Sequence, residues 1–156
     1  MIFIPESAIE DELSRYENLE LFQNDWEVFQ ELQPVLAYFI SVERLELLKD
    51  EEISLLEFMT VVVCKACSSM INKEIKIDVK TLDHYEEVNW EIWNNHITQS
   101  PTKAFDAFFH EYEQEDLLAF VEDSVQNDEE NMVTGAGMEL ISVTMKSIID
   151  SIHALN

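Results

Sequence analysis

Basic residues are scarce in this chain, whose 156 positions hold nine Lys and Arg against 33 Asp and Glu, for a formal net charge of -24. So few cations cannot overcome the repulsion of a phosphate backbone, and this excludes direct binding to nucleic acid. Negative charge also opposes anionic lipid headgroups, so we expect no attachment to a membrane. The partner that such a surface attracts is a basic one.

Glycine and proline are also scarce, with two and three residues. Tight hairpins and phosphate-binding loops depend on such residues, so the composition argues against a β-rich fold and against a nucleotide-dependent enzyme. The sequence contains neither the Gly-x-Ser-x-Gly elbow of a serine hydrolase nor the calcium-binding loop of an EF-hand. We therefore predict no catalytic residue and no cofactor.

Long hydrophobic runs are missing as well. The longest uninterrupted apolar stretch, Val35 to Ile40, is far shorter than the roughly 20 residues that cross a bilayer. The first residues lack the cationic start and the apolar core of a signal peptide. We expect a soluble, cytoplasmic protein, in which two cysteines do not make a disulfide framework.

Apolar side chains, by contrast, make up 47% of the residues and recur mostly at helical spacing. No segment rich in Pro, Gly or Ser divides the chain. These features predict a single acidic all-α domain over residues 1–156, built as a bundle of about seven helices. Helix starts are predicted from capping residues and first-turn prolines: Ser7 with Glu10, Asn24 with Glu27, Pro34, Asp50, Asp83 with Glu86, and Ser100 with Pro101.

The segment from Asp50 to Ile71 carries apolar residues on most of its faces, which predicts the central, most buried helix. The helix that starts at Pro34 should run toward Lys49. A change of phase predicts a helix break near residues 113–115, and the last helix should follow the two glycines at 135 and 137.

Residues 74–80 show a different pattern, in which apolar and polar side chains alternate strictly. No partner strand is evident for this segment. We therefore predict a short extended connector that packs Ile75, Ile77 and Val79 on the bundle, with an intermolecular edge strand as the alternative.

Negative charge is concentrated at the two ends of the chain. Residues 1–57 have a net charge of -12 and residues 104–156 of -11, whereas residues 58–103 carry only -1. If the outer thirds adjoin in space, they form one negative face that steers a basic partner; otherwise the field is diffuse. The acids that we predict to bind the partner come from both ends: Glu10, Asp11, Glu12, Asp116, Glu122, Asp123, Asp128, Glu129 and Glu130.

Cys64 and Cys67 have the CxxC spacing of redox motifs, but they lie well inside a predicted helix. The amide groups of a helix N-terminus, which would stabilise a thiolate, are several turns away, so we interpret both as buried structural thiols. The four histidines lack the paired spacing of zinc ligands. Only Asp150 with His153 approximates a ligand pair; we predict no metal site and place His153 at the surface.

The aromatic residues are dense in the segment 90–112, and we interpret them as core side chains rather than as a protruding hot spot. Crowded carboxylates elsewhere should repel one another and have raised pKa values in the folded state. The folded chain would then take up protons before the unfolded chain does. Its stability should therefore rise on mild acidification.

Three functions follow from these features. The first is a non-catalytic acidic binding protein that engages a basic protein, in the manner of a nucleic-acid mimic, an inhibitor or an immunity protein. The second is an enzyme or small-ligand carrier with an apolar pocket between helices. The third is a helical scaffold whose charge serves solubility only, with its oligomeric state open.

Overall fold

The computed structural model describes residues 2–41, 46–127 and 133–155, and every regular element in these ranges is a helix. The all-α prediction is confirmed, with eight helices in the described ranges where about seven were predicted. They are α1 (Glu6–Arg15), α2 (Leu19–Leu32), α3 (Pro34–Ser41), α4 (Asp50–Ile71), α5 (Val79–His96), α6 (Pro101–Phe109), α7 (Glu115–Ser124) and α8 (Gly135–His153).

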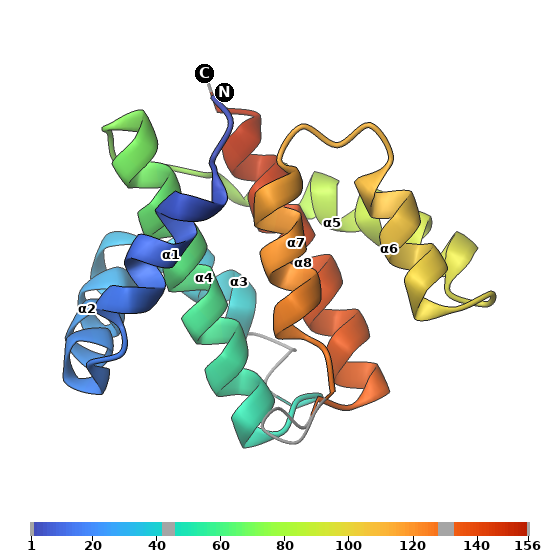
Figure 1. Cartoon of the computed structure of the whole chain (residues 1–156), viewed down its shortest axis with the longest axis horizontal. Coiled ribbons are helices and arrows are strands. Elements are labelled where there is room, and N and C mark those ends of the chain that lie inside the picture. Colours follow the sequence, from blue (N-terminus) through green and yellow to red (C-terminus); the bar gives the residue numbers. More distant parts are fainter. Residues whose placement is uncertain (1, 42–45, 128–132, 156) are drawn as a thin grey trace.

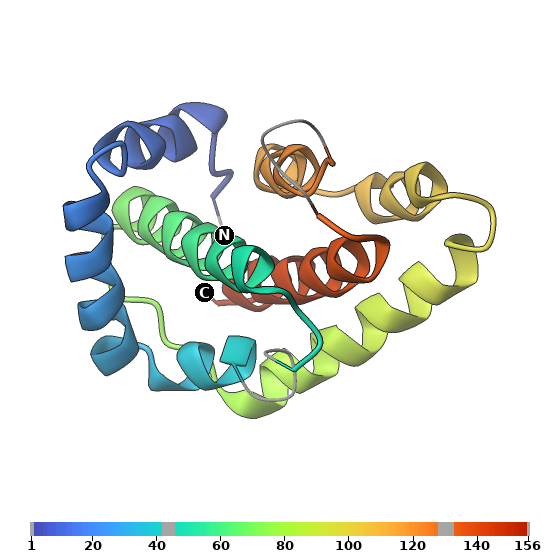
Figure 2. The same ribbon diagram turned by 90° about the horizontal axis from the view of Figure 1, so that it is seen from below.

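Two helices, α4 and α8, form the centre of the molecule. Figure 2 shows the other six arranged around them in chain order, from α1 through α2 and α3 to α5, α6 and α7. Figure 1 shows that α4 and α8 both start at the lower end of the molecule and run upward. The prediction that α4 is central is confirmed, but α8 shares this position. The prediction that α4 is the most buried helix is wrong, since 12 of the 19 residues of α8 are buried against 10 of the 22 of α4.

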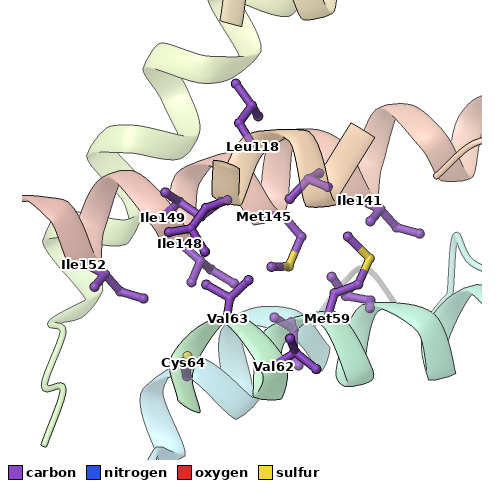
Figure 3. Packing of buried hydrophobic residues seen from close by; sticks show 14 of the residues in the cluster. Met59, Val62, Val63, Cys64, Leu118, Ile141, Met145, Ile148, Ile149 and Ile152 are labelled. Carbon is purple, nitrogen blue, oxygen red and sulfur yellow. The ribbon is translucent and has the colours of Figure 1, made fainter. Parts of the chain in front are cut away.

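The core lies between these two central helices, as Figure 3 shows. The side chains on their facing sides are fully buried, and each contributes about 1.5–3 kcal/mol by its removal from water. They include Met59, Val62 and Val63 of α4, and Ile141, Met145 and Ile148 of α8. The same hydrophobic cluster includes residues from all eight helices, so the surrounding ring is attached to one continuous core.

Hydrogen bonds to one carboxylate join the starts of α4 and α8. Glu52 is only 2% exposed; its Oε1 accepts from the Lys49 amide (2.9 Å), and its Oε2 accepts from the amide (2.9 Å) and hydroxyl (2.8 Å) of Thr134. A Cβ atom at Gly137 would overlap Oε2 of Glu52, so a larger residue here would displace this carboxylate. Burial would raise the pKa of Glu52, but the bonds from Lys49 and Thr134 outweigh it and lower the pKa.

α4 is the only helix in the described residues that is long and apolar enough to span a membrane. Half of its most apolar window is buried inside the protein. A helix in the core of a soluble protein can have this length and composition as well, because apolar side chains of the same protein surround it.

The two proline starts are confirmed. α3 starts at Pro34, and α6 starts at Pro101, after the Ser100 hydroxyl that accepts a hydrogen bond from the Lys103 amide (3.1 Å). α3 ends at Ser41 rather than running toward Lys49, and residues 42–45 lie outside the described ranges. The predicted break near residues 113–115 is confirmed, since α7 starts at Glu115.

Several predicted caps are wrong, because a capping residue stands earlier in the chain. Asn18, not Asn24, caps α2: its Oδ1 accepts from the amide of Glu20 (3.0 Å). Asp78, not Asp83, caps α5 and accepts from the amide of Thr81 (2.7 Å).

The observed starts of α1 and α4 differ from the predicted ones by only one or two residues. α1 starts after Pro5, without a side-chain cap, so Ser7 lies inside the helix. α4 includes Asp50 itself, with Lys49 in the capping position. In both helices the predicted apolar face is kept while the start moves by one or two residues.

The predicted connector is confirmed over residues 74–78, which have no regular secondary structure. Ile75 (1% exposed) and Ile77 (7%) pack on the core, and Gln33 donates a side-chain hydrogen bond to the Ile75 carbonyl (2.6 Å). The third residue, Val79, is 53% exposed because it starts α5 and so leaves the alternating pattern.

Candidate functional site

A groove of about 470 Å³ lies between α1 and α7, and Phe58 of α4 also lines it. Its lining residues are of two kinds. Five lining side chains are apolar and buried or half-buried, and we call them the floor: Ile9, Leu13, Phe58, Ala119 and Phe120. Four are carboxylic acids, and we call them the rim: Glu6, Glu10, Asp116 and Asp123; Ser124 completes the lining. None of the described residues that line the groove is Lys or Arg.

The two walls of the groove come from opposite ends of the chain, α1 from the acidic first third and α7 from the acidic last third. Figure 2 shows α1 and α7 on the same side of the central helices. The predicted condition for one negative face, that the outer thirds adjoin, is therefore met at this groove.

Hydrogen bonds of the amino-terminal segment hold α1 against α7. Buried Gln114, just before α7, accepts from the Ile4 amide (3.0 Å) and donates to the Ile2 carbonyl (2.9 Å). Asp116 accepts from the Glu6 amide (2.9 Å), at the first turn of α1. These bonds set the separation of the walls, and they leave three rim carboxylates, Glu6, Glu10 and Asp123, exposed to solvent.

The rim creates a site of uncompensated negative charge. Among the described residues, no Lys, Arg or His makes an ion pair with a rim carboxylate. The ion pairs elsewhere in the described residues include those of Asp25, Glu74, Glu113 and Asp150. A cation about 4 Å from a single carboxylate gains about 1 kcal/mol in water, and several carboxylates around one groove add to this.

Three of the nine predicted partner-binding acids, Glu10, Asp116 and Asp123, line this groove. Glu12 lies on another side of α1, in a hollow that it shares with Arg15 and Lys65. The other acids lie elsewhere: Asp11 is exposed outside the groove lining, Glu122 lies near Asp106 of α6, and Asp128, Glu129 and Glu130 fall outside the described residues.

Sequence reasoning missed Glu6 and the apolar floor. Glu6 lies four residues before Glu10, so helical spacing alone places the two on one face of α1. Leu13 follows Ile9 by four residues and Phe120 follows Leu117 by three, so helical spacing places each of them on the core-facing stripe of its helix. Nothing in the sequence indicates that α1 and α7 leave part of these stripes open between them.

Not all acids in this acidic protein have the same electrostatic environment. Burial raises the pKa of Glu12, Glu57 and Glu122, and at Glu122 the neighbouring Asp123 and Asp106 raise it further. Burial also acts on Asp25, but hydrogen bonds from Tyr16 and Arg15 lower its pKa. The raised pKa values of these acids thus follow mainly from burial and only secondly from repulsion between neighbouring like charges.

A second polar cluster lies inside the molecule, where α5 packs along α8. Lys146 Nζ is 2.9 Å from Asp150 Oδ2, and these side chains are only 7% and 12% exposed. Asp150 also accepts from the Tyr112 hydroxyl (2.6 Å) and from the Asn89 amide (2.9 Å). Burial, and then Asp150, raise the pKa of Tyr112. The Lys146 ammonium lies 4.2 Å from the centroid of the Tyr112 ring and 5.2 Å from that of Phe108.

This Lys146–Asp150 network is closed, because its donors and acceptors are bonded to one another. It ties α5 and the segment between α6 and α7 to the central helix α8. Lys146 and Asp150 are four residues apart on one helix, so each turn of α8 contributes one partner. We assign the network a structural role, since a bound ligand would first have to displace one of these partners.

His153 is half-buried rather than at the open surface where it was predicted. Its Nε2 lies 3.0 Å from Glu113 Oε2, and its Nδ1 lies 3.2 Å from the side-chain amide nitrogen of Gln114. The segment before α7 therefore covers the end of α8. Asp150 engages Lys146 instead of pairing with His153.

The two cysteines are buried inside α4, as predicted. Burial raises the pKa of the Cys67 thiol to about 12 and also raises that of Cys64. Both therefore stay protonated at neutral pH and lack the thiolate that redox chemistry uses. Within the described residues, no group of three or more His, Cys, Asp or Glu side chains is placed to hold a metal ion.

The aromatic residues of the segment 90–112 lie mostly in the core. Trp93, Phe105 and Phe108 are at most 2% exposed and contact one another, with ring centroids 5.4–6.3 Å apart. This confirms their interpretation as core side chains.

Comparison with known proteins adds no relative. No protein-family model matches this chain, and no curated protein or solved structure is significantly similar to it.

Proposed function

We propose that this protein is a non-catalytic binding protein that engages a basic protein partner through the groove between α1 and α7. One observation supports this function above the others: helices from the two acidic ends of the chain surround a single groove whose rim holds four carboxylates and no described cation. A basic partner would be steered to this groove by the charge of the whole molecule and would then be held by the rim.

The class of partner follows from the same charge. A protein with a cationic surface, such as one that binds nucleic acid, or a basic toxin, would meet complementary charge on the rim. Where the partner's cationic surface is its nucleic-acid site, this protein would act as a mimic and exclude nucleic acid from it. The binding should weaken as salt rises, because exposed charges are screened over about 8 Å at physiological ionic strength.

The experiment compares two variants with equal net charge. The rim variant carries Glu6→Gln, Glu10→Gln, Asp116→Asn and Asp123→Asn. The control variant carries Glu27→Gln, Glu31→Gln, Glu87→Gln and Glu91→Gln, four exposed acids on α2 and α5 that lie outside the groove lining. Each variant raises the net charge by four, so a difference between them reports on position and not on total charge.

Affinity for poly-lysine is measured by titration calorimetry at about 0.05 M and about 0.5 M salt. We expect the rim variant to bind at least about tenfold more weakly than the control variant at low salt, a difference of about 1.4 kcal/mol. Equal weakening in both variants would overturn the proposal and favour a charge that serves solubility only. A stoichiometric small molecule in native mass spectra of the purified protein would favour the ligand-carrier alternative.

A further inference from the structure

The apolar floor of the groove can contribute to binding in a way that attraction between charges cannot. Leu13, Phe58 and Phe120 are half-buried, so part of each apolar side chain stays in contact with water. Covering apolar surface contributes about 25 cal/mol for each Å² removed from water. A partner that brings apolar side chains to this floor would therefore bind more tightly than one that brings charge alone.

The walls determine the length of segment that fits. α1 and α7 have ten residues each, so at 1.5 Å per residue each wall is about 15 Å long. A helical segment of about ten residues, roughly three turns, has the same length.

The rim carboxylates are spaced as a helix would need them. Glu6 and Glu10 are four residues apart on α1, about 6 Å along its axis, and Asp116 and Asp123 are seven apart on α7, about 10.5 Å. Lys or Arg residues four and seven positions apart on one side of a helix have these same separations. Apolar residues between them would face the floor.

An extended segment fits less well, because the walls are helices. The backbone groups of α1 and α7 are mostly bonded within their own helices, so they offer no ladder of donors and acceptors to a strand. A helix satisfies its own backbone and needs only side-chain contacts. A second copy of this chain is disfavoured because each copy carries a net charge of -24.

Building on the proposed function, we infer that the groove receives one face of a basic amphipathic helix from the partner. About three turns of this helix lie between α1 and α7, with apolar side chains on Leu13, Phe58 and Phe120. Its Lys and Arg residues, on both sides of the apolar stripe, meet the rim carboxylates.

Two synthetic peptides of one composition test this inference. The first is a 14-residue peptide of Leu and Lys in which Leu recurs at helical spacing. The second has the same residues in an order that forms no apolar stripe. Fluorescence anisotropy of labelled peptides should show at least about tenfold tighter binding of the first to the native protein. Equal affinities would overturn the inference.

A protein variant tests the groove directly. Ala119→Trp adds a large side chain to the floor, and Ala107→Trp makes the same change at a half-buried position of α6 outside the groove lining. We expect Ala119→Trp to weaken binding of the amphipathic peptide at least about tenfold and Ala107→Trp to leave it unchanged. Equal effects of the two substitutions would contradict the inference.

Hydrogen exchange on the unaltered protein keeps the inference testable if either Trp variant unfolds. The amphipathic peptide should slow amide exchange in α1 and α7 and leave α2 and α3 unchanged. Protection elsewhere, or none, would overturn the inference.

The two proposals fail in different ways. If the rim variant binds poly-lysine as the control variant does, the proposed function fails. If poly-lysine requires the rim but the two Leu-Lys peptides bind equally, only the amphipathic helix is rejected.

Discussion

The Lys146–Asp150 network and the groove between α1 and α7 place the same side chain, a carboxylate on a helix, in opposite surroundings. Asp150 has three donors and is nearly buried, whereas Glu10 and Asp123 are exposed and have no cation among the described residues. In the network the charge is compensated within the fold, so it stabilises one arrangement of helices. On the rim it is left for a partner to compensate.

Glu52 represents a third environment, between these two. It is buried like Asp150, but backbone amides and a hydroxyl satisfy it instead of a cation. The environments therefore predict a graded response when a carboxylate is removed or its contacts are broken: largest at the network, intermediate at Glu52 and smallest at acids that are exposed or partly exposed.

The largest effect is expected at the network. Asp150→Ala leaves the Lys146 ammonium buried without its counterion, and this should lower the free energy of unfolding by about 3–5 kcal/mol. Asp123→Ala, on the rim, should change it by less than about 0.5 kcal/mol. Urea denaturation followed by circular dichroism measures both.

A conservative substitution at position 150 separates the effect of losing the negative charge from the effect of losing side-chain volume. Asp150→Asn keeps the volume and one acceptor oxygen, so its cost should fall between those of Asp150→Ala and Asp123→Ala. If Asp150→Ala were as mild as Asp123→Ala, the contrast between a compensated and a free carboxylate would be lost.

The intermediate effect is expected at Gly137. Gly137→Ala places a methyl group where Glu52 Oε2 lies, so the carboxylate must move away from Thr134. Loss of these buried hydrogen bonds should cost about 1–3 kcal/mol.

Gly135 supplies the matched control, because a Cβ atom there meets open space. Gly135→Ala should stabilise the protein by up to about 1 kcal/mol, since alanine loses less backbone entropy on folding. Thermal unfolding of the two variants should move the midpoint in opposite directions, and a shift in the same direction would contradict the role assigned to Glu52.

The smallest effect is a dependence on pH. The raised pKa of Glu122 means that its ionised form destabilises the fold, so stability should increase as pH falls through this folded pKa. The lowered pKa of Glu52 acts oppositely: its stabilisation is present above the unfolded pKa and is lost as pH falls through the folded pKa. Stability should thus rise slightly as pH falls toward the ordinary glutamate pKa of about 4.3, and fall at pH values below it.

Glu122→Gln should reduce the rise in stability on mild acidification without removing the loss of stability at lower pH. Because Glu122 is partly exposed, we expect a change of about 0.5 kcal/mol or less. Urea midpoints at several pH values, with Glu87→Gln as the exposed control, measure it. A rise that Glu122→Gln leaves intact would assign the effect to other acids.

The sequence was sufficient to predict the helical class, the central place of α4 and the starts of α3 and α6, because Pro34, Pro101 and apolar spacing act locally. Caps were harder to predict, since Asn18 and Asn24 both suit the start of a helix. The choice depends on which start lets the whole helix bury its apolar face. The predicted function and partner-binding acids stay predictions, and only Glu10, Asp116 and Asp123 of those acids line the groove.

By itself, the sequence determined that the molecule is helical, that its charge is negative and that this charge lies at both ends of the chain, since these properties depend on composition and short-range order. Only the tertiary structure decided that α1 and α7 share one groove, that Lys146 is buried beside Asp150 and that Glu52 joins α4 to α8. The physical reason is that each of these features depends on packing between helices distant in the chain, and apolar spacing does not specify which faces meet.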